Sequence, residues 1–131
     1  MKTFSKPVGW LVVGFMLLAF PAAAADAPKV LSVIAVKVKG DQAAYLQRVK
    51  QLRTIMNRLE TGGTLRVWRA TAAGQSTGTI YVGIEFVSLE AYAKGMTKLQ
   101  ADEEWSKTIK ELDASGLREV ISNSLLAEIT P

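Results

Sequence analysis

The stretch TIYVGIEF, residues 79–86, carries the strongest fold signal in this sequence of 131 residues. Apolar side chains recur at every second position, namely Ile80, Val82, Ile84 and Phe86, and the positions between them hold Tyr81, Gly83 and Glu85. Successive side chains of a β-strand point to opposite faces of a sheet. The stretch therefore predicts a strand with one strongly apolar face and one mixed face.

Two earlier stretches alternate in the same way. VLSVIAVKVK, residues 30–39, puts Ile34, Val36 and Val38 on one face and Val33, Ala35 and Lys37 on the other. TLRVWRA, residues 64–70, sets Leu65 and Val67 against Arg66, Trp68 and Ala70. A turn-like loop at 71–78 joins this strand to residues 79–86, which predicts a hairpin. A last strand is expected over 118–129, although helix is possible for its end.

Two helical regions separate these strands. Residues 42–60 carry one apolar stripe at spacings of three and four, formed by Tyr45, Val49, Leu52, Met56 and Leu59. Gly62 and Gly63 follow, where a glycine can take the left-handed helix cap. The second region begins after Ser88, a favourable N-cap. It breaks and restarts at residues 101–104 and ends near Ser115 and Gly116.

The order β-α-β-β-α-β is that of the ferredoxin-like fold, so the sequence predicts a single α+β domain. Two right-handed crossovers give a four-stranded antiparallel sheet with the helices on one face. The open face would carry Trp68, Tyr81 and Val33, which is too apolar to be left fully wet. We therefore expect a two-fold homodimer in which two open faces form an α+β barrel.

Residues 1–25 have the pattern of a secretory signal peptide. Lys2 and Lys6 precede an apolar run over 8–20, which is too short to span a bilayer, and then Pro21 and four alanines. We expect cleavage near Ala25, a mature domain over residues 26–131, and a periplasmic or secreted location without stable membrane anchoring. The mature chain keeps 14 basic and all 12 acidic residues, a net charge of +2, which gives no basis for nucleic-acid binding.

The chain has no cysteine and no histidine. Within one chain this excludes haem ligation by histidine, thiolate chemistry, a Ser-His-Asp triad and a typical zinc site. No cofactor and no metal site are therefore expected. The acidic run at 102–104 is typical of a solvated helix start and lacks companion metal ligands.

The element order and two passages, VGIEFVSLEAYAK at 82–94 and LQADEEW at 99–105, resemble the dimeric α+β-barrel superfamily. Within it the chain is most similar to NIPSNAP-like and small antibiotic-biosynthesis-monooxygenase-like domains, over residues 30–129. The resemblance implies the ferredoxin-like fold and a dimer. Members range from cofactor-free oxygenases and haem-degrading enzymes to domains without known activity. The histidine found in several active members has no counterpart here.

The candidate site lies on the open face and consists of Arg66, Trp68, Tyr81 and Glu85, with Ser122 or Asn123 from the last strand. Trp68 and Tyr81 would stack on a flat molecule, and Arg66 would hold an anionic group. Glu85 is the candidate base, with Tyr81 as a second weak catalytic candidate. The same residues also fit a purely structural role, with the aromatics as interface packing and Arg66 paired with Glu85.

Two functions follow from this site. The first is a dimeric domain that binds a small hydrophobic or aromatic ligand in the barrel, or that serves as an interaction module. The second is a cofactor-independent monooxygenase-like enzyme acting on a phenolic or aromatic substrate. The volume and polarity of the interior discriminate between them, because ligand sites are apolar cavities with a few convergent polar groups.

Overall fold

The computed structural model describes residues 27–131, so the predicted signal peptide at 1–25 lies outside the described part of the chain. The elements in chain order are β1 (Val30–Val38), α1 (Gln42–Leu59), β2 (Thr64–Arg69), a 3-10 turn (Gly74–Ser76), β3 (Ile80–Phe86), α2 (Leu89–Ala101), α3 (Glu103–Ala114) and β4 (Arg118–Ala127). The predicted order is confirmed, and the second helical region is divided in two as expected.

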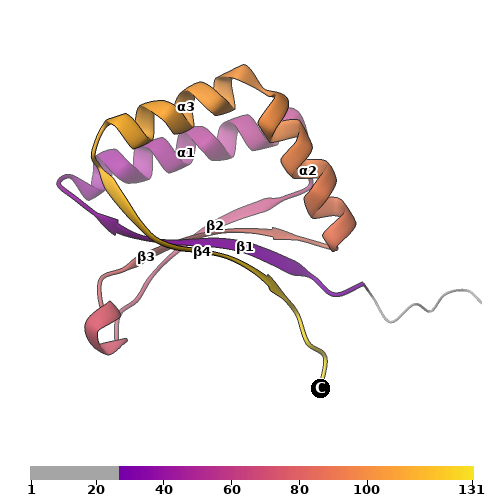
Figure 1. Ribbon diagram of the computed structural model, residues 1–131, viewed down its shortest axis with the longest axis horizontal. Helices are drawn as coiled ribbons and strands as arrows, with labels where there is room; N and C mark the ends of the chain where they lie inside the picture. The colour runs from indigo at the N-terminus through magenta and orange to yellow at the C-terminus, as the bar shows by residue number, and fades with distance from the viewer. Residues whose placement is uncertain (1–26) are drawn as a thin grey trace, which may run out of the picture.

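The four strands form one sheet in the order β2-β3-β1-β4, and every neighbouring pair is antiparallel. Figure 1 shows α1 and α3 side by side over one face of this sheet and α2 inclined at one end, while no α-helix of residues 27–131 covers the other face. This is the predicted α+β, ferredoxin-like class. None of the helices in residues 27–131 combines the length and apolar character needed to cross a membrane.

The core lies between the helices and the covered face of the sheet. The apolar positions of the three alternating strands point into this core, and the apolar stripe of α1 packs on them. The buried residues of the core are Val36, Tyr45, Val49, Leu52, Met56, Leu65, Ile80, Val82, Leu99 and Leu112. The faces predicted for residues 30–39, 64–70 and 79–86 are those observed, because Ile34 pairs with Val82 and Leu65 with Ile84.

Asp102 makes the junction between α2 and α3. Its extended backbone (φ −88°, ψ 124°) ends α2, and its side chain accepts a hydrogen bond of 2.9 Å from the amide of Trp105 as the N-cap of α3. The guanidinium of Arg58 donates to both carboxylate oxygens at 3.0 Å. These partners lower the pKa of Asp102, with the Trp105 amide first and Arg58 second. The junction thereby fixes where α3 begins and places Trp105 in its first turn.

Phe86 occupies a slot formed by two glycines. A methyl group on Gly95, in α2, would lie 2.6 Å from the Phe86 ring, and one on Gly63 would lie 2.8 Å from it. Tyr92 packs against the ring edge-on, with centroids 5.6 Å apart.

The cap of α1 differs from the prediction, since Glu60 rather than a glycine takes the left-handed conformation after the helix (φ 50°). Gly63 instead serves the close approach of Phe86.

Candidate functional site

The strand register brings the four predicted open-face residues onto one surface. Tyr81 lies opposite Trp68 on one side and opposite Ala35 on the other. Arg66 lies opposite Gly83, and Glu85 lies between Thr64 and Leu31. Because side chains alternate along a strand, all four point away from the helices. Their placement is as predicted, while their role in binding stays a prediction.

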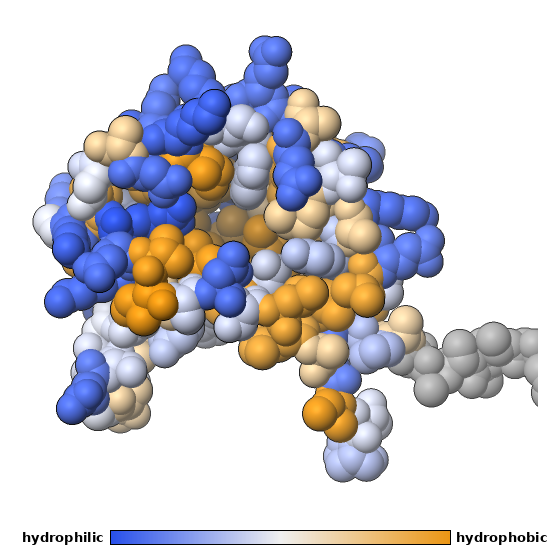
Figure 2. All heavy atoms as spheres, in the orientation of Figure 1, coloured by the Kyte–Doolittle hydropathy of each residue, from blue (hydrophilic) through white to orange (hydrophobic). Residues whose placement is uncertain are grey.

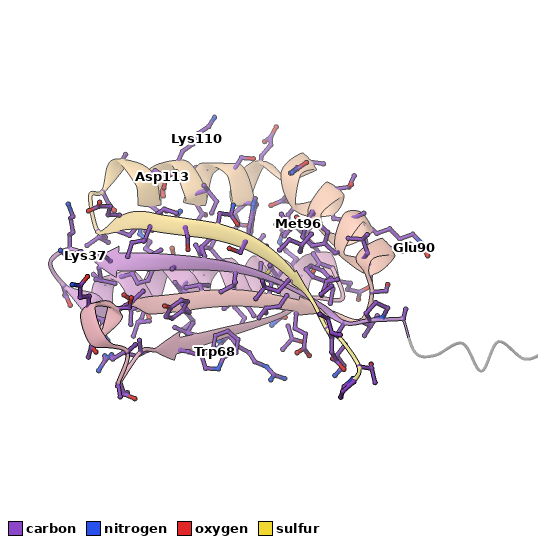
Figure 3. The ribbon with its side chains drawn as sticks, turned by 60° about the horizontal axis from the view of Figure 1, so that its bottom comes forward. Lys37, Trp68, Glu90, Met96, Lys110 and Asp113 are labelled. Atoms are coloured by element: carbon purple, nitrogen blue, oxygen red, sulfur yellow. The ribbon has the colours of Figure 1, made fainter. Side chains whose placement is uncertain are left out.

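Trp68 covers the middle of this open face with its own ring. A methyl group on Gly83 would lie 2.7 Å from Trp68 Cζ3 and 2.9 Å from Leu31 Cδ1, so the indole lies over Gly83 and beside Leu31. The side chain is 43% exposed, and Figure 3 shows it on the lower side of the sheet. Because Gly83 has no side chain, the Trp68 ring can lie directly against the backbone there.

Two expectations about this face need correction. Glu85 pairs with Lys29, with 3.9 Å between Oε1 and Nζ, and the alternative ion pair with Arg66, its diagonal neighbour, is absent from residues 27–131. Asn123 pairs with Ile34 and so points to the helix side; Ser122, opposite Ala35, is the residue on the open face. A β-bulge interrupts the pairing of β4 with β1 between Ala35 and Val36.

The helix side of the sheet holds a cavity of about 210 Å³. Its walls come from the sheet below and from all three helices above; they are Ser32, Ile34, Tyr45, Val49, Leu52, Leu65, Val82, Ile84, Met96, Trp105, Ile109, Arg118 and Asn123. Figure 2 shows apolar atoms set back in a hollow between the helix layer and the sheet. Asn123, which the sequence pattern places on the open face, therefore lines this cavity instead.

Two residues that line this cavity, Tyr45 and Arg118, each carry a buried polar atom that has no hydrogen-bond partner among the described residues. Tyr45 is fully buried and its hydroxyl is unpaired. The side chain of Arg118 is only 8% exposed, and its Nε is unpaired, while Nη2 donates to Asp113 Oδ1 at 3.1 Å. An unsatisfied buried polar group costs about 1–3 kcal/mol, and native structures contain few. Two such donors in one cavity wall are the strongest chemical signal in residues 27–131.

Burial raises the pKa of Tyr45, and the nearby guanidinium of Arg118 offsets this only in part. The phenol therefore stays protonated throughout the physiological range and keeps its O–H group as a donor beside Arg118. Among the lining residues Arg118 is the one that carries a charge, and none of them is a carboxylate. The cavity is thus mainly apolar, with Arg118 contributed by the sheet and Tyr45 by the helix layer.

Tyr45→Phe will reduce the fall in the free energy of unfolding that occurs at alkaline pH. The unfolded phenol ionises near its ordinary pKa of about 10, below the raised pKa of the folded state, so the unfolded chain loses its proton first. The wild-type free energy of unfolding must then fall as the pH rises above about 10, and the Phe variant must lack this component. Urea unfolding at pH 8 to 11 measures it, and parallel curves for the two proteins would contradict the assignment.

Three comparisons relate this architecture to known proteins. The sequence matches no family model and no curated protein. Solved structures match it at low identity, and the class they define is the ferredoxin-like fold of NIPSNAP and related proteins. Identities of this size carry the fold alone.

Three of the matching structures show the extent of the similarity. The chain is similar to a mutant form of SnoaB, a cofactor-independent oxygenase from Streptomyces nogalater (TM-score 0.59, 14% identity, 80% of this chain and 97% of that one). It is similar to a NIPSNAP family protein with unknown function from Agrobacterium tumefaciens (0.58, 20%, 79% and 90%). It is also similar to a dimeric ferredoxin-like protein from an uncultured marine organism (0.50, 12%, 81% and 92%).

Proposed function

We propose that this protein binds a small, single-ring organic ligand in the cavity between its helices and its sheet. The observation that carries the proposal is the pair of buried, unpaired donors, Tyr45 Oη and Arg118 Nε, in residues of a cavity whose other lining residues are apolar apart from Ser32 and Asn123. An apolar cavity with a few convergent polar groups is the usual form of a ligand site. The ligand site is thereby moved from the open face, where the sequence pattern places it, to the helix side.

The volume limits the ligand. Cavities for drug-sized molecules measure about 300–1,000 Å³, and this one measures about 210 Å³. One aromatic ring with a short polar substituent fits that volume. Trp105, Ile109 and Met96 supply the apolar surface for such a ring.

Filling the cavity will abolish binding of a single-ring probe. Fluorine NMR line broadening of 4-fluorobenzoate and 4-fluorobenzamide detects weak binding to the wild type. Met96→Phe adds a ring to the cavity wall, so we expect at least a tenfold loss of affinity for either compound that binds. Leu46→Phe is the matched control, since Leu46 is exposed on α1 and does not line this cavity. No binding to the wild type, or equal binding to both variants, would contradict the proposal.

The open face supports the proposed homodimer. Leu31, Val33 and Ala35 from β1, with Trp68 and Tyr81, give it an apolar centre without helix cover. A second copy of the same face is the self-complementary partner that two-fold symmetry supplies. In such a barrel Arg66 and Glu85 would lie between the sheets. The marine neighbour described as dimeric is consistent with this arrangement.

Export remains a proposal that rests on the pattern of residues 1–25. Intact mass measurement of the protein recovered from the periplasmic fraction tests it. A chain beginning at Asp26 supports signal cleavage after Ala25, and a full-length chain in the cytoplasm opposes export.

Cofactor-independent oxidation of a phenol is the second candidate function. It is favoured by Arg118, since a guanidinium beside the cavity would stabilise a phenolate. The candidate base Glu85 lies on the opposite face of the sheet, so it cannot act on a ligand in this cavity. Oxygen uptake with single-ring phenols, lost in Arg118→Met, would support the enzyme; no uptake with a phenol that binds would leave binding as the function.

A further inference from the structure

We infer that the ligand of the helix-side cavity carries an anionic oxygen, a carboxylate or a phenolate, which Tyr45 Oη and Arg118 Nε hold together. The inference rests on the proposed function and adds the chemical class of the head group. It follows from the kind of polar atoms in the wall, their burial and the charge around them.

Both unpaired atoms are hydrogen-bond donors. The Nε–H of arginine has no acceptor capacity, and a protonated tyrosine hydroxyl donates one hydrogen bond while its oxygen can also accept. A ligand oxygen that accepts from both satisfies two buried groups at once. A ligand whose head group is a donor leaves Arg118 Nε unpaired and loses that benefit.

The charge distribution favours an anion over a neutral acceptor. Arg118 supplies the positive charge among the lining residues, and the others are uncharged side chains. Asp113 lies outside the cavity on α3, 59% exposed, and binds Nη2. Because the ion pair engages that nitrogen, it anchors the guanidinium and leaves Nε as the free donor. A hydrogen bond from a charged donor to a charged acceptor is roughly twice as strong as a neutral one.

The wall fixes the orientation of the bound molecule. Arg118 and Asn123 lie on β4 and Tyr45 on α1, whereas Trp105 and Ile109 lie on α3 and Met96 on α2. The anionic oxygen would lie against Arg118 and Tyr45, and the ring against the residues of α2 and α3. Asn123 also lines the cavity, but its partner on β1 is Ile34, four residues along the strand from Val38, the partner of Arg118.

Matched probes separate this inference from the proposed function. 4-Fluorobenzoate and 4-fluorobenzamide have the same ring and nearly the same shape, and only the first is an anion. We expect the wild type to bind the benzoate at least tenfold more tightly. Tyr45→Phe and Arg118→Met should each reduce this preference to less than threefold while binding of the amide changes little. 4-Fluorophenol, followed from neutral to alkaline pH, tests whether phenolate is preferred to phenol.

Each outcome has a distinct meaning. Preference for benzoate identifies a carboxylate head group, and tighter binding of phenolate than phenol identifies a phenolate. Equal affinity for the charged and neutral members of both pairs overturns the inference and leaves the proposed function standing. If no probe binds the wild type, the proposed function fails as well. A preference that survives both substitutions would also overturn the assignment to Tyr45 and Arg118.

Discussion

Gly95→Ala will destabilise the protein by about 1–3 kcal/mol, although alanine is the better helix former. Gly95 lies in the middle of α2, where replacing glycine by alanine ordinarily stabilises by about 1 kcal/mol. Here the new methyl would lie 2.6 Å from Phe86 Cε1 and 2.8 Å from the backbone oxygen of Thr61. Overpacking of this kind is destabilising, and the backbone contact cannot be relieved by a rotamer change.

Urea unfolding measures the effect as a lower midpoint at unchanged slope. Ala93→Gly is the matched control in the same helix, because Ala93 is exposed and its loss costs only the propensity difference of about 1 kcal/mol. Phe86→Leu in the Gly95→Ala background should recover part of the loss, as a coupling of at least about 0.5 kcal/mol. A Gly95→Ala protein more stable than the wild type would contradict the packing described for Phe86.

Val33→Glu will convert the proposed dimer to a folded monomer. Val33 lies on β1 in the open face, directly between Gly83 on β3 and Ser124 on β4. In the dimer the new carboxylate would be buried without a partner, twice per assembly, and one such charge costs about 3–5 kcal/mol. Dimer affinity should therefore fall more than about 100-fold. In the monomer the same side chain reaches solvent, so the fold should persist.

Sedimentation equilibrium at micromolar protein measures the dimer affinity, with circular dichroism as the check on folding. Leu89→Glu is the matched control, an exposed apolar residue at the start of α2 that lies away from the open face. It should leave the dimer intact. A wild-type monomer would refute the dimer proposal, and a Val33→Glu dimer would place the interface on another surface.

Most of the fold can be predicted because the hydrophobic periodicity of residues 30–114 is clear. Residues 79–86 alternate without interruption, and the strand observed begins at Ile80 and ends at Phe86. The division of the second helical region follows from Asp102, whose side chain caps α3. The faces of β1, β2 and β3 follow from the same alternation.

The last strand is different, because its sequence does not alternate. Val120 and Ile121, and then Leu125 and Leu126, are adjacent apolar residues, and all four are exposed on an edge strand. No burial constraint therefore fixes which residues point to the helices, and the bulge near Ile121 changes the parity again. For that reason the sequence alone puts Asn123 on the wrong face.

The helix-side cavity could not be predicted from the sequence for a related reason. Tyr45 belongs to the α1 stripe and has the pattern of an ordinary core residue, and Arg118 has that of the polar start of a strand. Only packing reveals that the tyrosine hydroxyl finds no partner and that the arginine is buried beside it. The sequence offers one sign of this cavity, namely that Arg118 and Asn123 are polar residues on the same strand. It does not show which face of the sheet they occupy.

The most direct test of this account is a crystal structure of the protein with 4-iodobenzoate, located by the anomalous scattering of iodine. We predict the iodine against Trp105, Ile109 and Met96, with the carboxylate at Tyr45 Oη and Arg118 Nε. Iodine on the open face beside Trp68 and Tyr81, with the helix-side cavity unchanged, would contradict the central claim.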